Sequence, residues 1–383
     1  MITEDDSLHI MKYEYLYNGH GVGIGDFNND GQPDVFISGN TVPSRLFLNM
    51  GKLRFEDVTA RAGLIHKKTW ATGVSIADIN GDGLLDIYVS HSGSFQDSTK
   101  LANELWINQG VKDGVPSFKD QAAEYGLDAP GTQSTQALFF DYDLDGDLDM
   151  FLLNHSNHTY NPFLNTRRIR SEPNLYFGNR LFRNERSGIT GASANVHATR
   201  FTDVTRQAGI VNNALNFGLS VNASDINGDG YPDIYTTSDY TEKDCLYINN
   251  RNGTFSEKLE QSVAYMSKYS MGSDIADYNN DGRVDILTLD MLPADNYRQK
   301  LLKGPDEYDQ YNMLADSGYY YQQMRNMLQL NQGTDPAGNL RFSEIGQLAG
   351  ISNTDWSWAG LFADFDNDGW KDIFITNGYL RDF

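Results

Sequence analysis

Short runs of apolar and β-branched residues recur along the chain, and clusters of Gly, Asp and Asn separate them. Examples are GVGIGDF and PDVFIS within 21–38, ATGVSIAD and LDIYVS within 71–90, and TQALFFD and LDMFLL within 135–153. Runs of this length and composition between turn-forming residues are typical of β-strands. The chain is therefore predicted to be all-β.

A second pair of apolar runs follows each of these pairs and contains an Asn at or near its turn. It reads SRLFLNMGKLRFEDVTARAGL at 44–64, NELWINQG at 103–110, NRLFRNE at 179–185, DCLYINN at 244–250 and NMLQLNQG at 326–333. Each repeat is thus predicted to contain four antiparallel strands, which is one blade of a β-propeller. A β-solenoid is the alternative, but its parallel coils contain no hairpins and suit this pattern less.

The first two predicted strands of each repeat are joined by a nine-residue loop of the form D-x-[DN]-x-D-G-x-x-D. The six copies begin at Asp26, Asp78, Asp141, Asp225, Asp277 and Asp364. They start 52, 63, 84, 52 and 87 residues apart, so the two 52-residue intervals are the unit without insertions. Periods of roughly 40–50 residues are typical of propeller arrays.

The carboxylates of these loops have the spacing of calcium ligands. Ca²⁺ takes about six to eight oxygen ligands in flexible geometry, and each loop offers side-chain oxygens at places one, three, five and nine and a carbonyl at place seven. Place six is Gly because the chain must turn sharply round one ion. Up to six Ca²⁺ are expected, and the predicted ligands are Asp26, Asn28, Asp30, Gln32, Asp34, Asp78, Asn80, Asp82, Leu84, Asp86, Asp141, Asp143, Asp145, Asp147, Asp149, Asp225, Asn227, Asp229, Tyr231, Asp233, Asp277, Asn279, Asp281, Arg283, Asp285, Asp364, Asp366, Asp368, Trp370 and Asp372.

Two other structures fit part of the loop pattern. An EF-hand begins in a similar way, but it ends in Glu at place twelve and lies between helices. None of the six loops has Glu at that place, and their flanks are predicted strands. A turn of Asp, Asn and Gly that is closed by its own side-chain hydrogen bonds, without metal, is the alternative for any single loop.

With its flanking residues, the loop resembles the FG-GAP/VCBS repeat. The resemblance rests on G-[small or apolar]-x-[apolar]-x-D-x-[DN]-x-D-G-x-x-D-[apolar]₃ across 18–383 and on the tail F-x-D-V-T-x-x-A-G-[LI] at Phe55–Leu64 and Phe201–Ile210. Such repeats occur in the propeller of integrin α-subunits and in large bacterial cell-surface proteins. The resemblance implies a calcium-loaded β-propeller, usually of seven blades. DMLPADNYRQKLL at 290–302 and ITNGYLRDF at 375–383 are similar to segments of multi-domain bacterial envelope proteins.

Residues 1–383 are predicted to form a single propeller domain whose last repeat is incomplete. Eleven residues follow Asp372, enough for a second strand but not for a third and fourth. Either LHIMKYEYLY at 8–17 completes that blade, or the protein continues past Phe383 and the chain is a fragment. The second alternative is favoured because DIFITNGYLRDF stops within the repeat pattern.

The chain is strongly acidic, with a formal net charge of −22 that six Ca²⁺ would reduce to about −10. Without cations, carboxylates crowded in one loop repel each other by roughly 1 kcal/mol or more per close pair. This acidity argues against nucleic acid, whose phosphates require Lys and Arg. No run of 18 apolar residues is present for membrane insertion, and MITEDDSLHI is unlike a signal peptide.

The expected calcium affinity of the loops predicts where the protein is located. Open loops of this kind commonly bind with Kd values of about 10⁻⁴–10⁻³ M and therefore fill outside cells. The expected location is extracellular or at the cell surface, on the exterior of a bacterial outer membrane, with the export signal removed. Cys245 is the single cysteine, so no internal disulfide forms. It is expected to be a small buried hydrophobe.

Two long intervals, 154–199 and 290–329, are predicted insertions, and insertions in repeat proteins often form the binding face. The first contains the candidate partner-binding residues His155, His158, Arg167, Arg168 and Arg170. Because Arg matches carboxylates bidentately, an acidic glycan or a protein is the expected partner. A solvated basic loop is the alternative.

The second insertion has helical character over Asn296–Leu302, which is rich in helix formers. It also carries a cluster of tyrosines, Tyr308, Tyr311, Tyr319, Tyr320 and Tyr321. Tyr is favoured at recognition surfaces because it offers contact area with a polar tip. A helical layer that covers the propeller is the alternative.

No catalytic motif is present: the chain lacks H-E-x-x-H, G-x-S-x-G and a phosphate-binding Gly loop. The predicted function is a non-enzymatic, calcium-stabilised binding module that recognises a glycan or protein at the cell surface. The second hypothesis, by family analogy, is a polysaccharide lyase that uses His155, His158 and the nearby arginines. A structural subunit of a cell-envelope complex is the third.

Overall fold

The structure is a computed structural model that describes residues 9–10, 13, 15–16, 18–40, 42–65, 69–93, 98–156, 166–185, 200–302 and 308–378. The chain divides into two compact units. The first consists of Met1–Asn157 and Asn174–Thr205, and the second of His158–Pro173 and Arg206–Phe383. The prediction of a single domain stays a prediction.

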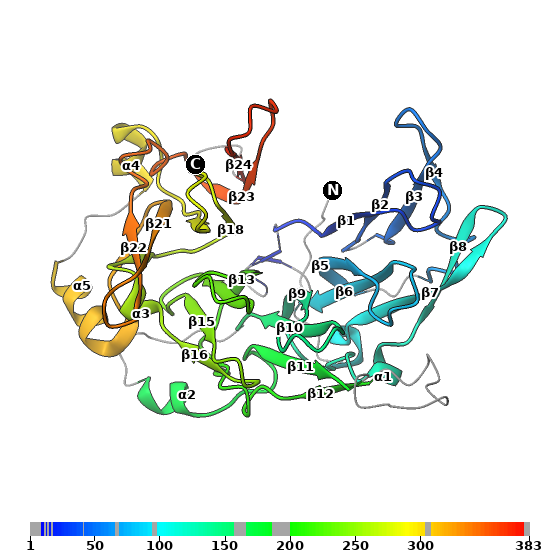
Figure 1. Cartoon of the computed structure of the whole chain (residues 1–383), viewed down its shortest axis with the longest axis horizontal. Coiled ribbons are helices and arrows are strands. Elements are labelled where there is room, and N and C mark those ends of the chain that lie inside the picture. Colours follow the sequence, from blue (N-terminus) through cyan, green and yellow to red (C-terminus); the bar gives the residue numbers. More distant parts are fainter. Residues whose placement is uncertain are drawn as a thin grey trace. The chain divides into compact units, whose positions relative to one another are not determined.

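Within its described residues, the first unit contains three antiparallel sheets of four strands each (Figure 1). The strands are β1 (Val22–Gly25), β2 (Asp34–Ile37), β3 (Arg45–Asn49), β4 (Phe55–Asp57), β5 (Trp70–Ala77), β6 (Asp86–Ser92), β7 (Glu104–Lys112), β8 (Val115–Asp120), β9 (Ser134–Phe140), β10 (Asp149–Asn154), β11 (Arg180–Asn184) and β12 (Phe201–Asp203). Two short helices, η1 (Ser98–Leu101) and α1 (Ala122–Tyr125), lie in the connections.

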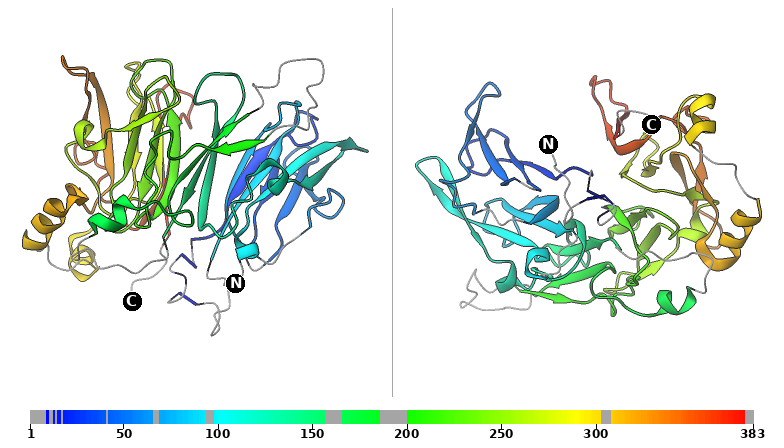
Figure 2. Two further views of the ribbon diagram at one scale, coloured as in Figure 1. Left: turned by 90° about the horizontal axis from the view of Figure 1, so that it is seen from below. Right: turned by 180° about the vertical axis from the view of Figure 1, so that it is seen from behind.

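The second unit contains two further sheets of four strands and one sheet in which two strands are described (Figure 2). The strands are β13 (Gly218–Ser224), β14 (Asp233–Ser238), β15 (Cys245–Asn249), β16 (Phe255–Glu257), β18 (Ser273–Ala276), β19 (Asp285–Thr288), β21 (Met327–Thr334), β22 (Leu340–Glu344), β23 (Ser357–Ala363) and β24 (Asp372–Asn377). A short parallel pair, β17 (Met266–Ser267) with β20 (Gln322–Gln323), lies outside these sheets.

These sheets confirm the predicted all-β fold and its repeat. In each of them, consecutive strands of the repeat pair with one another and are antiparallel, so each four-stranded sheet is a blade of the β-propeller type. The acidic loops join the first two strands of the sheets, which excludes an EF-hand. The antiparallel pairing also excludes a solenoid. The number of blades stays a prediction.

The suggestion that residues 8–17 complete the sixth blade stays a prediction, because part of this stretch lies outside the described residues. Tyr13, Tyr15 and Leu16 are buried, and the described residues of this stretch belong to no strand. The Tyr13 ring instead packs edge-on against Trp70 in the first unit, with 5.8 Å between ring centroids. Burial of the Tyr13 and Tyr15 side chains holds these residues against the first unit.

Glycines allow neighbouring sheets to approach closely within each unit. In the first unit, a Cβ on Gly73 of β5 would lie 2.3 Å from the carbonyl oxygen of Thr135 in β9. In the second, a Cβ on Gly272, just before β18, would lie 2.6 Å from the carbonyl oxygen of Trp358. A side chain at either position would push two first strands apart, so the Gly of the repeat pattern is a packing requirement.

Hydrophobic cores lie between successive sheets of a unit. In the core shared by the first and second sheets, Phe36 of β2 and Leu46 of β3 are packed with Trp106 of β7. Equivalent cores lie between the second and third sheets and between the fourth and fifth.

The tail motif F-x-D-V-T-x-x-A-G-[LI] ties the end of the fourth strand to the third strand of the same sheet in both of its copies. Thr59 Oγ1 accepts a hydrogen bond from the Leu46 N–H at 3.0 Å and donates one to Asp57 at 2.6 Å. Thr205 repeats this arrangement with Leu181 and Asp203. The Val and Ala of the motif are buried in both copies.

The helices of the second unit belong largely to the predicted insertions. The predicted helix over Asn296–Leu302 is confirmed as α4. The others are α2 (Arg167–Ser171), α3 (Leu259–Ser262), α5 (Tyr308–Leu314) and the π-helical turn η4 (Ala315–Tyr319). None of the helices in the described ranges has both the length and the apolar character needed to cross a membrane.

Cys245 is buried in β15, as predicted. Burial raises the pKa of its thiol to about 12. The residue therefore packs as a small hydrophobe, because a thiol that stays protonated is a poor nucleophile.

His155 is buried in the first unit, with 1% of its surface exposed. Its Nδ1 donates a hydrogen bond to the Ser156 carbonyl at 2.9 Å, and its ring packs edge-on against Tyr15 with 4.8 Å between centroids. Desolvation lowers the pKa of this imidazole from 6.5 to about 4. The side chain is therefore neutral in the folded protein near neutral pH.

His155 makes stability depend on pH in one window. Between pH 6.5 and about 4 the unfolded chain binds a proton at His155 that the folded chain does not, so the free energy of unfolding falls as the pH drops. The effect is worth up to about 3 kcal/mol. Urea unfolding should show a flatter pH dependence in this window for His155→Gln than for the unchanged chain. His20→Gln, at an exposed position, is the control and should leave the slope unchanged; equal slopes for all three proteins would contradict the assignment.

Candidate functional site

All six acidic loops share one backbone conformation. Place six is a Gly whose φ lies between 84° and 92° in every loop. Place four also has positive φ, from 56° to 75°, and is occupied by Asn29, Gly81, Leu144, Gly228, Asn280 and Asn367. The sequence predicts the turn at the Gly of place six, and the Asn or Gly that stands at place four in five loops is a second signal for it that the spacing of carboxylates does not reveal. Both residue types tolerate the left-handed region, which explains their use.

The carboxylate at place one closes the loop on itself. Asp26 Oδ1 accepts a hydrogen bond from the Asp30 N–H at 3.0 Å, and Asp26 Oδ2 accepts one from the Gly31 N–H at 2.7 Å. The same pair of bonds recurs in the other five loops. The place-five carboxylate in turn accepts the N–H of place seven, at 2.8 Å in the first loop. These bonds turn the acidic side chains toward the inside of the loop.

The carboxylate at place nine joins the loop to the third strand of its sheet. Asp233 Oδ2 accepts the Ile226 N–H at 3.0 Å, and Oδ1 accepts the Asn249 N–H at 2.8 Å. The Asn249 side chain donates a further bond to the Pro232 carbonyl at 3.1 Å. The same Asp and Asn pair occurs in all five four-stranded sheets: Asp34 with Asn49, Asp86 with Asn108, Asp149 with Asn184, Asp233 with Asn249, and Asp285 with Asn331.

These five ninth-place carboxyls are almost fully buried. Desolvation raises the pKa of Asp86 and Asp233 to about 7, of Asp149 to about 8 and of Asp285 to about 6, although backbone N–H donors act in the opposite direction. Neighbouring loop carboxylates add to the rise. An ionised carboxylate in such a place requires a positive charge close by.

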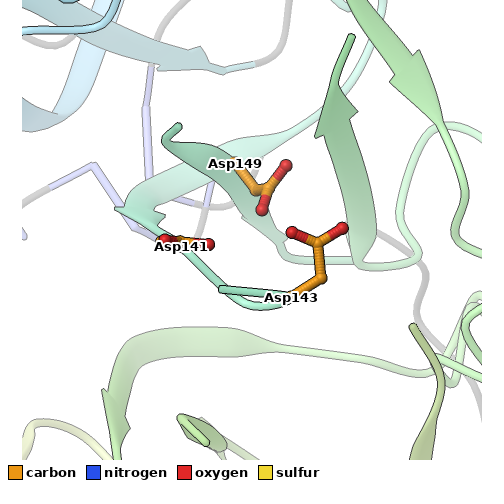
Figure 3. Close-up of side chains that lie close together, drawn as sticks. All are labelled: Asp141, Asp143 and Asp149. Carbon is orange, nitrogen blue, oxygen red and sulfur yellow. The ribbon is translucent and has the colours of Figure 1, made fainter. Parts of the chain in front are cut away.

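The loop that begins at Asp141 fits a hard cation. Asp141, Asp143 and Asp149 each place one oxygen within 4.8 Å of the others, and Figure 3 shows the three carboxylates turned toward a common space. Oδ1 of Asp143 is buried and has no hydrogen-bond partner in the described part of the chain. A buried carboxylate oxygen without a donor is costly unless a cation binds it. Asp364, Asp366 and Asp372 converge in the same way.

The other four loops carry Asn at place three, which reduces their charge. The Asn28 amide donates to Asp30 Oδ2 at 3.0 Å, and the equivalent bond recurs in the other three of these loops. In two of them an arginine also binds the place-five carboxylate, at 2.9 Å between Arg251 and Asp229 and at 2.7 Å between Arg283 and Asp281. The negative charge is therefore concentrated in the loops at Asp141 and Asp364.

The described residues of the first insertion place its predicted partner-binding side chains in different surroundings. His155 is buried, which corrects its prediction as a partner-binding residue. Arg168 is exposed and pairs with Glu172 at 2.8 Å, while His158 and the Arg167 side chain lie outside the described residues.

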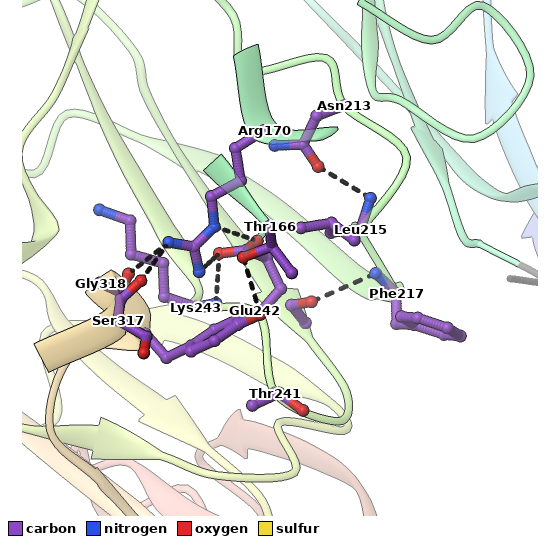
Figure 4. Close-up of polar contacts among 12 residues, drawn as sticks. Thr166, Arg170, Asn213, Leu215, Phe217, Thr241, Glu242, Lys243, Ser317 and Gly318 are labelled. Atoms are coloured by element: carbon purple, nitrogen blue, oxygen red, sulfur yellow. Dashed lines mark hydrogen bonds and ion pairs between the residues drawn. The ribbon is translucent and has the colours of Figure 1, made fainter. Parts of the chain in front are cut away.

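Arg170 is the centre of a clamp that holds the two insertions together in the second unit. Its guanidinium binds Glu242 at 3.2 and 3.3 Å and donates to the carbonyls of Ser317 and Gly318 at 3.1 and 3.0 Å, as Figure 4 shows. It also lies 4.1 Å above the Tyr319 ring centroid. Tyr319 is fully buried, so its prediction as a partner-binding residue is wrong. These Arg170 hydrogen bonds all go to oxygen atoms of the second unit, so the residue has a structural role.

The remaining tyrosines lie at or near the surface of the second unit. Tyr308 is 77% exposed and Tyr321 is 47% exposed, and Tyr311 lies beside Tyr321 with 6.3 Å between ring centroids. Tyr320 is anchored, because its hydroxyl donates to the Val263 carbonyl at 2.7 Å. We call Tyr308, Tyr311 and Tyr321 the tyrosine surface.

Comparison with known proteins identifies the repeat. The FG-GAP-like repeat profile matches residues 26–89 and 225–288. The chain therefore contains FG-GAP-like repeats. Each match begins at place one of an acidic loop, spans a 52-residue interval and ends in the strand after the next loop. The profile thus matches the two 52-residue intervals between loops that carry no insertion.

The chain is similar to cartilage acidic protein 1. The human protein is 27% identical over 217 residues, which cover 56% of this chain and 29% of the relative. The Xenopus tropicalis protein is 28% identical over 137 residues, covering 36% of this chain and 20% of the relative. The chain therefore spans 20% to 29% of the length of these curated relatives.

Among solved structures, the chain is similar to a lectin from Agrocybe aegerita that is described as recognising non-reducing terminal N-acetylglucosamine. The alignment covers 92% of this chain and 73% of the lectin chain. Its TM-score is 0.47 and its sequence identity is 17%.

The shared loop conformation predicts a stabilising substitution in this protein. Leu144 occupies place four with φ of 60° and is 49% exposed. A left-handed conformation costs a residue such as Leu roughly 1–2 kcal/mol, and Asn tolerates it better. Leu144→Asn should raise the free energy of unfolding by roughly 0.5–1 kcal/mol, measured by urea denaturation. The control Leu53→Asn, at an exposed position outside the loops whose φ of 54° is also positive, should behave likewise; a destabilised Leu144→Asn would contradict the strain argument.

Proposed function

We propose that this protein is a non-enzymatic binding module that calcium stabilises, acting outside the cell or at its surface. The observation that carries the proposal is the common geometry of six loops that turn their acidic side chains inward, with the partnerless, buried Oδ1 of Asp143 as its sharpest instance. The FG-GAP-like repeats support a binding module.

The side chains at places one, three, five and nine and the carbonyl at place seven are the proposed ligands. Oxygen donors without sulfur or imidazole suit Ca²⁺ better than softer metals. A bound ion would offset the repulsion among the loop carboxylates and the cost of burying the ninth-place group. Its effect on the fold would be to fix each first hairpin to the third strand of its sheet.

The loops are expected to differ in affinity. Those beginning at Asp141 and Asp364 have a carboxylate at place three where the other four have Asn. Arg251 and Arg283 already neutralise one carboxylate in each of two other loops. Affinity for calcium depends on the number of ligand charges, so the loop at Asp141, which lies in a complete sheet, should bind most tightly. Calcium at extracellular concentrations is needed to fill the rest, which is the basis for the proposed location.

The tyrosine surface is the proposed contact with a partner. Tyr308, Tyr311 and Tyr321 offer apolar area with polar tips, as recognition surfaces commonly do. Aromatic faces of this kind suit either a sugar ring or a protein segment, and we propose a glycan as the first partner to test. The lyase hypothesis loses two of its proposed residues, because His155 is buried and Arg170 is bound to Glu242.

The effect of the Asp143 carboxylate on the stability of the protein should depend on calcium. With calcium, Asp143→Ala should lower Tm by roughly 5 °C relative to the unchanged chain, because one site loses a ligand. After chelation, the same variant should be at least as stable as the unchanged chain, because a repelling carboxylate is gone. Differential scanning calorimetry in both conditions measures this reversal.

Two controls accompany that measurement. Asp143→Asn restores the Asn of the other loops and should retain most of the calcium response. Glu124→Gln, an exposed acidic position outside the loops, should leave the response unchanged. A Tm loss for Asp143→Ala that is equal with calcium and after chelation would show a purely structural role.

The tyrosine surface predicts a partner-binding defect without a folding defect. On an array of neutral and acidic glycans, Tyr308→Ala with Tyr321→Ala should weaken the strongest interaction by about tenfold, since buried aromatic contacts dominate such interfaces. Tyr297→Ala, in α4 and 73% exposed, is the matched control. Unchanged binding by the double variant would contradict this surface, and binding to no glycan would contradict a glycan partner.

A further inference from the structure

Arg251 occupies a backbone position that other sheets give to glycine. It stands two residues after Asn249, whose side-chain oxygen accepts the Arg251 N–H at 2.9 Å, and its φ is 60°. The corresponding residues of three other sheets make the same hydrogen bond and are glycines with positive φ: Gly51, Gly110 and Gly333. Because this conformation is unfavourable for a residue with a Cβ, the backbone strain points to a role for the Arg251 side chain.

The Arg251 side chain reaches the acidic loop that begins at Asp225. Its Nε donates a hydrogen bond to Asp229 Oδ2 at 2.9 Å, and its guanidinium carbon lies 5.9 Å from the centre of the Tyr231 ring. Asp229 is the place-five carboxylate of this loop and a proposed calcium ligand. The Arg251 side chain is 54% exposed, so it can leave Asp229 without disturbing a packed core.

Arg251 also lines a groove of about 330 Å³ in the second unit. The other lining residues come from the loop at Asp225, from α3 and the residue before it, and from the β21–β22 turn. This volume is at the lower end of the range for small-molecule sites. The groove therefore places a proposed calcium loop beside a space that a small ligand could fill.

Two cationic residues line this groove, Arg251 and Lys258, although the chain as a whole has a net charge of −22. The acids nearest to Lys258 in the sequence, Glu257 and Glu260, both bind Lys243, at 2.9 and 2.6 Å. In the described part of the chain, Lys258 has no acidic side chain within ion-pair distance. The groove is therefore suited to an anionic ligand.

Calcium and Arg251 compete for the same carboxylate. Asp229 Oδ2 accepts hydrogen bonds from Arg251 and from the Asn227 amide, and Oδ1 accepts the Tyr231 N–H at 3.0 Å. A divalent cation on either oxygen would lie close to the guanidinium and repel it. The displaced guanidinium would then turn its donors toward the groove that it already lines.

We propose that this groove binds the carboxylate of an acidic sugar, a uronate, through Arg251 and Lys258, and that calcium strengthens the binding by releasing Arg251 from Asp229. The Arg fork matches a carboxylate bidentately. The Gln261 amide and the Thr334 hydroxyl belong to residues that also line the groove. Groups of this kind donate to and accept from sugar hydroxyls, which favours a sugar over an acidic peptide.

The coupling rests on the proposed calcium site at Asp225, whereas binding in the groove does not. Linkage makes the coupling reciprocal: an acidic sugar must raise the affinity of this loop for calcium by the same factor by which calcium raises the affinity for the sugar.

Titration of the full chain with methyl β-glucuronide, followed by NMR at the amides of Arg251 and Lys258, tests the proposal. The affinity should be about tenfold higher with calcium than after chelation, because a charge-assisted hydrogen bond is gained. Methyl β-glucoside, the neutral match, should bind about tenfold more weakly than the glucuronide. The Gly230 amide, which donates to Asp225, reports separately whether calcium enters the loop.

Arg251→Gly places the residue of the other sheets at this position, so the variant should fold. It should bind the glucuronide about tenfold more weakly in calcium and lose the dependence on calcium. Its Gly230 amide should respond at lower calcium concentrations, because the competing cation is gone. Lys258→Gln should weaken the glucuronide in both conditions. Arg61→Gln, at an ion-paired arginine whose side chain is 53% exposed in the first unit, is the matched control and should change neither response.

The readouts separate the possible failures. Glucuronide affinity that calcium leaves unchanged, while Gly230 responds to calcium, would overturn the coupling. A Gly230 amide that does not respond would contradict the calcium site at this loop and the coupling with it. Unchanged glucuronide binding by Arg251→Gly, or equal binding of glucuronide and glucoside, would overturn the groove as the site. Tighter binding of N-acetylglutamate amide than of glucuronide would show an acidic peptide as the ligand and overturn the sugar.

Discussion

A single buried carboxylate connects the acidic loop to the sheet in each of the five complete sheets. In the five complete sheets, one oxygen of the ninth-place Asp binds the loop and the other binds the Asn of the third strand, as Asp233 does with Ile226 and Asn249. The group is costly to bury, and desolvation raises its pKa accordingly. The same carboxylate therefore fixes the hairpin and creates a need for positive charge beside it.

The third-strand Asn extends this connection from one sheet to the next within a unit. The Asn108 amide donates to the Phe27 carbonyl at 3.0 Å, and the Asn331 amide donates to the Ile226 carbonyl at 2.9 Å. Each of these bonds joins a third strand to the acidic loop of the preceding sheet. A cation in one loop would therefore stiffen two sheets, which is how many weak sites can stabilise a large all-β unit.

Features set by short sequence patterns could be predicted, and features set by long-range packing could not. The hairpins, the position of the loops and the helix α4 follow from local composition and were confirmed. The burial of His155 against Tyr15 and of Tyr319 beneath Arg170 depends on residues about 140 to 150 positions apart, so a surface role looked equally reasonable. The signal at place four was visible as repeated Asn and Gly, and Leu144 is the exception that obscured it.

The claim on which this account depends is that the acidic loops bind calcium. Anomalous X-ray scattering from crystals grown with calcium tests it most directly, since it locates the ions without reference to stability. The account predicts difference peaks about 2.3–2.6 Å from the side-chain oxygens in at least four of the six loops, with the strongest at Asp141, Asp143 and Asp149. Peaks in fewer loops, or ions bound away from these oxygens, would mean that the loops are turns closed by their own hydrogen bonds and would contradict the account.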